Sequence, residues 1–342
     1  MLLTSSFSEV SEMMEEFLPK KRDSVYLSHI YDLIGYQSKV KQVADCGSYL
    51  EFHHELDDDG IINEIGLLHR ANFCKDRLCP LCSWRRSLKM FGQISDIANN
   101  LHGDYLFLFL TLTVPNCRGS TLSSTINSMM RGFRKFIRCR DIKNISHGFI
   151  RSLEITYNLD KNTFHPHFHV ILAVGKNYVS SRNYLSHRDF ASLWTRSILG
   201  KNWRMQRQKP FVVDIRRCYS CDPDNSFSGS FVEAAKYAVK SSDYLFTDLT
   251  LSCKLVKIFT NVLFHRRLWQ FGGCFYDVYK ELDLPDIESD DVDLVHFEGR
   301  YNPLVRHYVE VFGWSPSGYK LVRNFIKEPD FTATADKSNK LS

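Results

Sequence analysis

HPHFHVILAV, residues 165–174, is the stretch that decides how this chain folds. Its first half alternates histidine with other residues and its second half is apolar and rich in β-branched side chains, which predicts a β-strand. Residues two apart on a strand share a face, so His167 and His169 point one way and Phe168 points into a core. Two neutral imidazoles side by side can hold a metal ion. The plainer alternative is a pair of buried, hydrogen-bonded histidines.

Two further stretches complete a predicted antiparallel sheet. Residues 105–114 are apolar and end in alternating threonines, and residues 148–157 alternate with Glu154 on the face away from their apolar side chains. The polar segment 158–163 is a good turn, so 148–157 and 165–174 are expected to pair as a hairpin. Helices predicted around the sheet make the chain an α+β protein.

A third feature lies at residues 231–240, whose alanines and apolar spacing predict a helix. At about 100° per residue, Glu233, Tyr237, Lys240 and Tyr244 fall within roughly 60° of one another on that helix. A carboxylate, a phenol and an ammonium group on one face form a reactive set. A solvated charged face would explain the glutamate and lysine but not the tyrosines.

In chain order, these motifs resemble those of the HUH endonucleases. They are Thr111-Leu-Thr113, then His165-Pro-His-Phe-His169, then Lys236-Tyr-x-x-Lys240. More narrowly, the chain is similar to plasmid rolling-circle replication initiators of Gram-positive bacteria, in which a glutamate lies four residues before the nucleophilic tyrosine. The resemblance also includes the cysteines at 74–82 and the segment 266–273, and covers roughly residues 40 to 280.

The resemblance implies a ferredoxin-like or RRM-like central antiparallel sheet with helices on one side. It implies a divalent ion, Mg²⁺ or Mn²⁺, held by His167, His169 and a carboxylate. Glu154 is the predicted third ligand because it lies on the neighbouring strand of the hairpin, and His165 is the alternative.

The activity implied is origin-specific nicking and strand transfer. Tyr237 would attack the DNA and form a 5′-phosphotyrosine, Lys240 would favour its phenolate, and Glu233 would activate water at termination. The implied partners are plasmid origin DNA, single-stranded at the nick, and a host helicase and polymerase. The alternatives are a conjugative relaxase, a single-strand transposase or a non-catalytic zinc-containing DNA-binding regulator.

The cysteines predict a separate metal site. Cys74, Cys79 and Cys82 have the spacing C-x4-C-x2-C, which is frequent in structural zinc sites. Tetrahedral zinc needs a fourth ligand, for which Cys46 is the first choice and His69 the alternative. A redox dithiol or plain buried thiols are the competing interpretations.

Basic residues in two places predict contacts to DNA. Arg85 and Arg86 lie on a polar face of a helix expected over residues 80–101. Lys201, Arg204 and Arg207 surround Trp203, a mixture that suits single-stranded DNA because bases stack on aromatic rings while phosphates pair with cations. A solvated basic surface would have the same composition.

Charge and targeting signals fit a DNA-binding protein of the cytoplasm. The net charge is +5, but residues 281–298 hold eight carboxylates, so 44 basic residues face 31 acidic ones over the remainder. No secretory signal or membrane-spanning run is evident, and ten cysteines then favour thiols and metal over disulfides.

The predicted organisation has three consecutive segments. Residues 1–102 form a helical region with the cysteine module, 103–250 the catalytic domain, and 251–342 a C-terminal region whose end is expected to be disordered.

Overall fold

The computed structural model describes residues 6–57, 59–62, 66–201, 203, 209–218, 230–236, 238–296 and 301–330. It confirms the α+β class, because the two sheets are built from antiparallel pairs and are accompanied by helices, with helices and the cysteine group in the N-terminal part. The chain forms two compact units, Met1–Arg85 with Asp293–Ser342, and Arg86–Val292.

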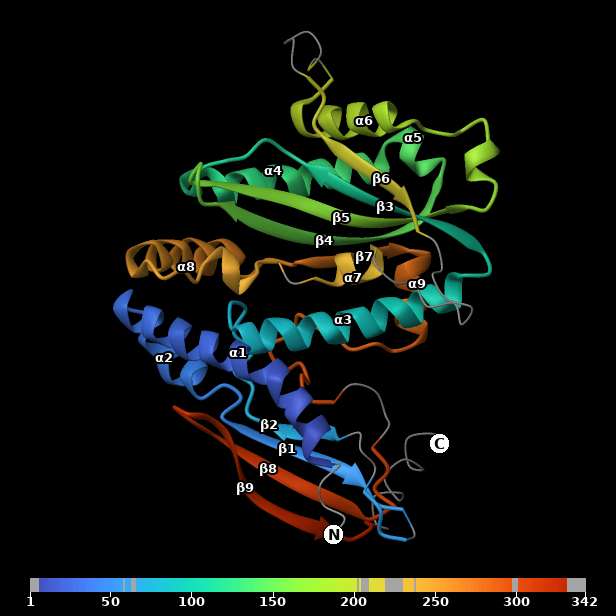
Figure 1. Ribbon diagram of the computed structural model, residues 1–342. Helices are drawn as coiled ribbons and strands as arrows, with labels where there is room; N and C mark the ends of the chain where they lie inside the picture. Colours follow the sequence, from blue (N-terminus) through green and yellow to red (C-terminus); the bar gives the residue numbers. More distant parts are fainter. Residues whose placement is uncertain are drawn as a thin grey trace. The chain divides into compact units, whose positions relative to one another are not determined.

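The unit Arg86–Val292 contains a five-stranded sheet in the order β6-β3-β5-β4-β7 (Figure 1). Its strands are β3 (Tyr105–Thr113), β4 (Ser146–Asn158), β5 (Thr163–Gly175), β6 (Val213–Arg217) and β7 (Trp269–Gly273). The predicted hairpin is confirmed, since β4 and β5 pair along their lengths from Asn158 opposite Thr163. The histidine strand β5 is therefore central, with β3 on one side and β4 on the other.

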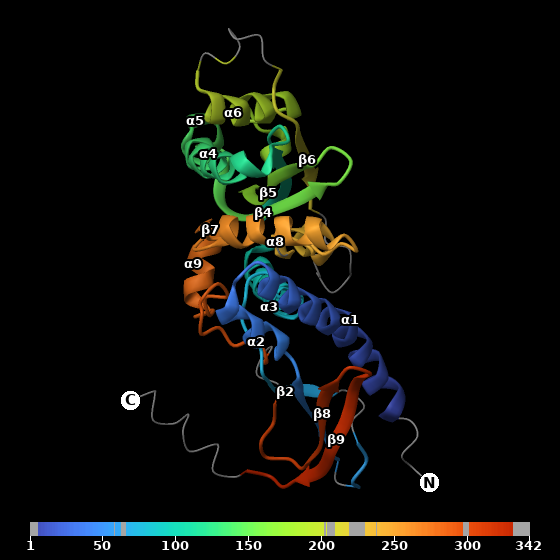
Figure 2. The same cartoon turned by 90° about the vertical axis from the view of Figure 1, so that its left-hand side faces the viewer.

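Helices cover this sheet on both faces rather than on the single face that was expected. Figures 1 and 2 show α4 and α6 on one side, and Figure 1 shows the short α7 on the other. The helices assigned wholly or mainly to this unit are α3 (Pro80–Leu101), α4 (Gly119–Arg138), α5 (Arg140–Lys143), α6 (His187–Leu199), α7 (Ser230–Ala235), α8 (Leu249–Leu263) and α9 (Cys274–Glu281), with 3-10 turns at Tyr178–Ser180 and Ser241–Asp243. None of the helices in the described ranges is long and apolar enough to cross a membrane.

The core lies between the sheet and α4 with α6. Phe168 is fully buried, with its ring centroid 5.7 Å from that of Phe133 on α4 and 6.1 Å from that of Trp194 on α6. Helix α6 begins with a capping box, in which the backbone N–H of Asp189 donates to the Ser186 hydroxyl and the Asp189 carboxylate accepts from the Ser186 N–H. Because Phe168 faces this core, the histidines on either side of it face away from α4.

The unit that joins the two ends of the chain contains a second antiparallel sheet, ordered β2-β1-β8-β9. Its strands are β1 (Tyr49–Glu55), β2 (Leu67–Ala71), β8 (His307–Ser315) and β9 (Gly318–Lys327), and its helices are α1 (Ser6–Leu33) and α2 (Gln37–Ala44). The first residues of α3 also belong to it.

These two units differ from the predicted segments 1–102, 103–250 and 251–342. Two long-range pairings account for the difference: β8 pairs with β1, and β7 pairs with β4. The first joins the C-terminal part to the N-terminal part, and the second adds residues 269–273 to the five-stranded sheet. Strand partners so far apart in sequence leave no local signal.

Candidate functional site

Glu154 on β4 and His167 and His169 on β5 meet on the sheet face away from Phe168. Glu154 is paired with His167 across the hairpin. Its Oε2 lies 2.8 Å from His169 Nε2 and 3.5 Å from His167 Nε2. All three side chains are buried, and one ligand atom from each lies within 4.8 Å of the others. The structure thus brings the three predicted metal ligands together in a group that could hold an ion.

The other ring nitrogen of each histidine has a partner behind it. His169 Nδ1 lies 3.3 Å from the Thr111 hydroxyl on β3, and His167 Nδ1 lies 3.2 Å from the backbone carbonyl oxygen of His165. Partners of this kind orient metal-binding imidazoles and set which nitrogen faces the ion. With each Nδ1 occupied, the Nε2 atoms converge on Glu154.

The Glu154 carboxyl is held in its ionised form. Burial alone would raise its pKa, but hydrogen bonds and charge interactions with His167 and His169 outweigh burial and place the pKa well below its usual range. The site therefore presents a buried anion and two imidazoles, a donor set that suits a divalent cation.

His165, the alternative third ligand, is placed elsewhere. Its Nδ1 lies 2.8 Å from the side-chain oxygen of Asn116, and it is not part of the group formed by Glu154 and the two other histidines. The geometry therefore favours Glu154 over His165.

Glu233 and Lys240 reach this site, although the predicted helix over 231–240 is wrong beyond Ala235. Helix α7 ends there, and Lys240 has extended backbone angles of φ −78° and ψ 150°. The backbone N–H of Ile155 on β4 donates to the Ala238 carbonyl oxygen at 2.7 Å. This bond to β4 gives the Ala238 carbonyl oxygen a partner in place of a helical hydrogen bond, because each buried backbone group needs one.

The side chains nevertheless converge. Glu233 Oε1 lies 3.9 Å from His169 Nε2, and Lys240 Nζ lies 3.8 Å from Glu154 Oε1. About a third of the Glu233 side chain and two-fifths of the Lys240 side chain are exposed, at 35% and 43%. A carboxylate and an ammonium group therefore lie between the buried group and solvent.

Of the two tyrosines predicted on this segment, Tyr237 lies outside the described residues. Tyr244 is only 1% exposed and packs near Phe259, with ring centroids 6.2 Å apart. A phenol that deeply buried is not presented to a macromolecular substrate.

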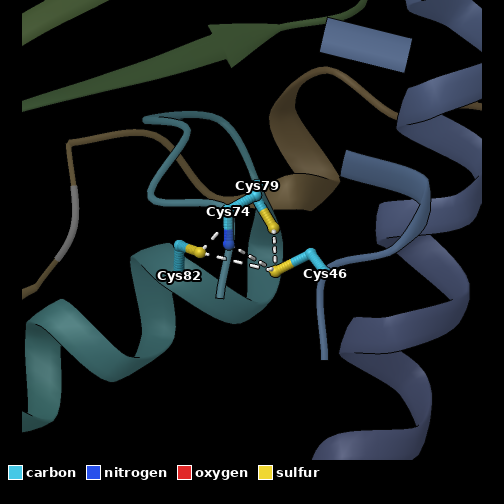
Figure 3. Close-up of side chains that lie close together, drawn as sticks. All are labelled: Cys46, Cys74, Cys79 and Cys82. Carbon is cyan, nitrogen blue, oxygen red and sulfur yellow. Dashed lines mark hydrogen bonds between the residues drawn. The ribbon is translucent and has the colours of Figure 1, made fainter. Parts of the chain in front are cut away.

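The four predicted cysteines converge in the other unit (Figure 3). Cys46 Sγ lies 3.4 Å from Cys79 Sγ and 3.5 Å from Cys82 Sγ, and Cys74 Sγ lies 3.6 Å from Cys82 Sγ. These separations are well beyond a disulfide bond, which is about 2.05 Å long. The sulfurs also accept backbone N–H groups, from Lys75 to Cys82 at 3.1 Å and from Cys74 to Cys46 at 3.4 Å. The group is a closed, buried, four-sulfur cage.

His69, the alternative fourth ligand, is absent from the cage. It lies instead with Glu51 and His53 in the sheet of the same unit. Cys46 precedes β1 and the other three cysteines follow β2, so the antiparallel hairpin brings the fourth sulfur to the rest.

The predicted DNA contacts of Arg85 and Arg86 are corrected by their burial. Arg85 donates to the backbone oxygens of Leu294 and Val295 at 2.9 and 2.8 Å, and Arg86 donates to that of Ile287 at 3.3 Å. The two residues are 6% and 7% exposed. These guanidinium groups donate hydrogen bonds to backbone carbonyl oxygens of distant residues. They therefore have a structural role and do not contact a DNA phosphate.

Trp203 also differs from its predicted role, because it is 4% exposed and offers no free ring face on which a base could stack. Lys201 is exposed and stays a predicted contact, while Arg204 and Arg207 lie outside the described residues.

Two residues beside the site were missed. Thr111 was predicted only as part of the Thr111-Leu-Thr113 motif, although the alternation of that strand could have placed its hydroxyl beside His169. Arg216 on β6 lies with its guanidinium carbon 5.4 Å from the ring centroid of Phe109, which stacks on His169 at 5.2 Å. Nothing in the sequence indicates that Arg216 lies here, because β6 and β3 pair although they are far apart in the chain.

Comparisons with known proteins match most of the chain to replication proteins. Residues 66–320 match the family described as "Replication protein". "Protein rep" of Bacillus amyloliquefaciens is 34% identical over 309 residues, 85% of each chain. "Protein rep" of Streptococcus pneumoniae serotype 2 is 33% identical over 280 residues, covering 80% of this chain and 81% of that one. "Protein rep" of Staphylococcus aureus is 34% identical over 236 residues, covering 68% and 95%. No solved structure matches.

The geometry predicts which residue completes the ion-binding group. Glu154→Gln keeps the shape of the side chain but removes its charge, so Mn²⁺ affinity should fall by roughly 10- to 100-fold or more. His165→Ala should change it little, because His165 faces Asn116. Electron paramagnetic resonance of free Mn²⁺ during titration measures both. The reverse order of effects would assign the third ligand to His165.

Proposed function

The chain belongs to the replication protein family of plasmid replication initiators, and from that premise we propose that it nicks one strand of a plasmid origin to start rolling-circle replication. The observation that carries the proposal is the buried Glu154 carboxylate between His167 and His169, with Glu233 and Lys240 at its open side. The product is a 5′-phosphotyrosine on the protein and a free 3′-hydroxyl.

The Glu154, His167 and His169 group fits Mg²⁺ or Mn²⁺. The carboxylate oxygen suits either ion, and the imidazoles suit Mn²⁺ better. When bound, such an ion supplies Lewis-acid polarisation of the scissile phosphate. The protein's own contribution is to keep the carboxylate ionised and both Nε2 atoms aimed at one point.

Tyr237 is the proposed nucleophile. Its phenol oxygen attacks phosphorus and forms the new P–O bond, the bond from phosphorus to the 3′-oxygen breaks, and that oxygen leaves as a hydroxyl after gaining a proton. An ordinary tyrosine has a pKa near 10 and is mostly protonated at neutral pH. Lys240, whose ammonium group lies beside Glu154, supports the phenolate by its positive charge.

Glu233 is the proposed general base for termination. Its carboxylate reaches the same site from α7 and remains partly exposed, so a water molecule can approach it. As Glu233 removes a proton from that water, the water oxygen attacks the phosphorus of the returning junction, the bond from phosphorus to the 3′-oxygen breaks, and that oxygen leaves as a hydroxyl after gaining a proton. The junction is then cleaved without a second covalent attachment. Its contact with Lys236, 3.4 Å away, is a surface ion pair of about 0.3–0.5 kcal/mol and does not compete with this role.

The remaining parts have supporting roles in this proposal. The cage of Cys46, Cys74, Cys79 and Cys82 holds structural Zn²⁺, since four buried thiolates and no open position typify such sites. The DNA is single-stranded at the nick, and Lys201 adds a phosphate contact. In the cytoplasm a host helicase separates the strands and a host polymerase extends the new 3′ end.

Replacing Tyr237 tests the nucleophile. Tyr237→Phe should lower nicking of supercoiled origin plasmid by roughly 10³-fold or more and abolish the covalent protein–DNA product, because the attacking oxygen is gone. Origin binding in a gel-shift assay should stay near wild type. Tyr244→Phe is the matched control and should nick normally, since Tyr244 is buried. Covalent attachment by Tyr237→Phe but not by Tyr244→Phe would identify Tyr244 as the nucleophile.

Replacing Glu233 separates initiation from termination. Glu233→Ala should still nick and attach to DNA but yield products longer than one plasmid unit, because no base activates the terminating water. Lys236→Ala removes the neighbouring ion pair and serves as the control. Unit-length circles from Glu233→Ala at wild-type yield would leave Glu233 with the ion pair alone.

The zinc assignment is tested by elemental analysis of full-length protein purified without chelator. Cys79→Ser should contain one zinc fewer per chain than wild type and unfold more readily, because structural zinc contributes directly to folding. Cys117→Ser lies outside the cage and should retain the wild-type content. Equal zinc in Cys79→Ser and wild type would exclude zinc from the cage.

A further inference from the structure

A second group of metal-binding side chains lies in the unit that carries the cysteine cage. Glu51 and His53 on β1 and His69 on β2 each bring one ligand atom within 4.8 Å of the others. His53 Nε2 is 2.9 Å from Glu51 Oε1, and the rings of His53 and His69 lie 3.9 Å apart between centroids. Nothing in the nicking proposal uses these residues.

A β-bulge places His69 beside the other two. Arg70 is paired with Glu51 and Leu68 with Phe52, so His69 is the extra residue between two regular pairs. Glu51 and His53 share a face by their spacing of two. A bulge redirects the side chain of the extra residue, which turns His69 toward that face instead of away from it.

The surroundings leave ring nitrogens without partners. Glu51 and His53 are 5% and 2% exposed. His53 Nδ1 and His69 Nδ1 are buried and have no hydrogen-bond partner among the described residues, and the same holds for Nε2 of the adjoining His307, whose ring centroid lies 5.5 Å from that of His53. Buried polar atoms in folded proteins nearly always have a partner, so several together point to a missing one.

The groups around the site leave room for a cation. Tyr49 donates its hydroxyl to the other carboxylate oxygen of Glu51, which orients it. Two basic side chains lie nearby. Arg70 Nε is 4.0 Å from Glu51 Oε1 with its side chain 68% exposed, and the Lys327 ammonium group donates to the Tyr301 hydroxyl at 2.9 Å. Tyr301 covers the ring of His69, with centroids 4.5 Å apart, and shields this side of the group from water.

We propose that Glu51, His53 and His69 bind a second divalent transition-metal ion, of the zinc class, in the β1–β2 hairpin. Two imidazole nitrogens with one carboxylate form a donor set that zinc-like ions bind readily. The Glu154 group has the same donors, but in the proposed reaction phosphate oxygens of the DNA would complete its coordination, which favours Mg²⁺ or Mn²⁺ there. The cysteine cage ties together the two ends of this hairpin, and the proposed ion cross-links its middle. The proposal does not depend on the nicking activity.

Metal content of matched variants tests it. After equilibration with Zn²⁺ and removal of the excess, the full-length double variant His53→Gln/His69→Gln should hold one zinc fewer per chain than wild type. The control is His54→Gln. His54 is the next residue on β1, is equally buried and faces Glu310 at 3.3 Å, so its replacement should leave the zinc count unchanged.

Cobalt substitution shows that the lost ion is not the one in the cage. Intense sulfur-to-cobalt absorption arises only from thiolate ligands and should be equal in the double variant and wild type. Equal zinc content in the two proteins would overturn the proposal.

Should the double variant fail to fold, anomalous X-ray scattering at the zinc edge from wild-type crystals decides. A peak between Glu51, His53 and His69 supports the site, and a peak at the cysteine cage without one here overturns it.

Discussion

The antiparallel register of β4 with β5 is the constraint on which the candidate site depends. It places Glu154 opposite His167 and, on the other face, Leu153 opposite Phe168. A shift of one residue would turn Glu154 toward Phe133 and Trp194, and burying an unpaired carboxylate there costs several kcal/mol. Burying Leu153 and Phe168 instead is worth about 1.5–3 kcal/mol each. The core therefore selects the register that also assembles the polar group.

The same register explains why much of this sheet was predictable. Alternation, the turn at 158–163 and the capping box at Ser186 are local signals, and the structure has strands and a helix where those signals placed them. Glu154 was placed near the histidines by the hairpin alone. The cysteine cage was also predictable, because three of its members lie within nine residues and only Cys46 had to be chosen from a distance.

The rest could not be predicted because it is decided by distant partners. Residues 236–240 have helical propensity, yet the Ile155 N–H takes the Ala238 carbonyl and the helix ends. Arg85 and Arg86 have the composition of a DNA-binding face, but residues 287–295 provide carbonyls that bury them. The histidine group with Glu51 depends on a single bulged residue, which no periodic pattern indicates.

The pairing of β8 with β1 has a consequence for the order in which the chain can fold during synthesis. Residues 86–292 are complete as a unit before residues 307–315 emerge from the ribosome, whereas β1 must wait for β8 through the whole of that interval. During this time β1 is paired with β2 along one edge, and its other edge has no partner. An unpaired strand edge readily pairs with other chains. The cysteine cage closes over residues 46–82 alone, so it can hold the two ends of the early hairpin together until its third strand arrives. A metal ion in the cage, as proposed above, would therefore keep the β1–β2 hairpin formed during this interval, in addition to stabilising the finished fold.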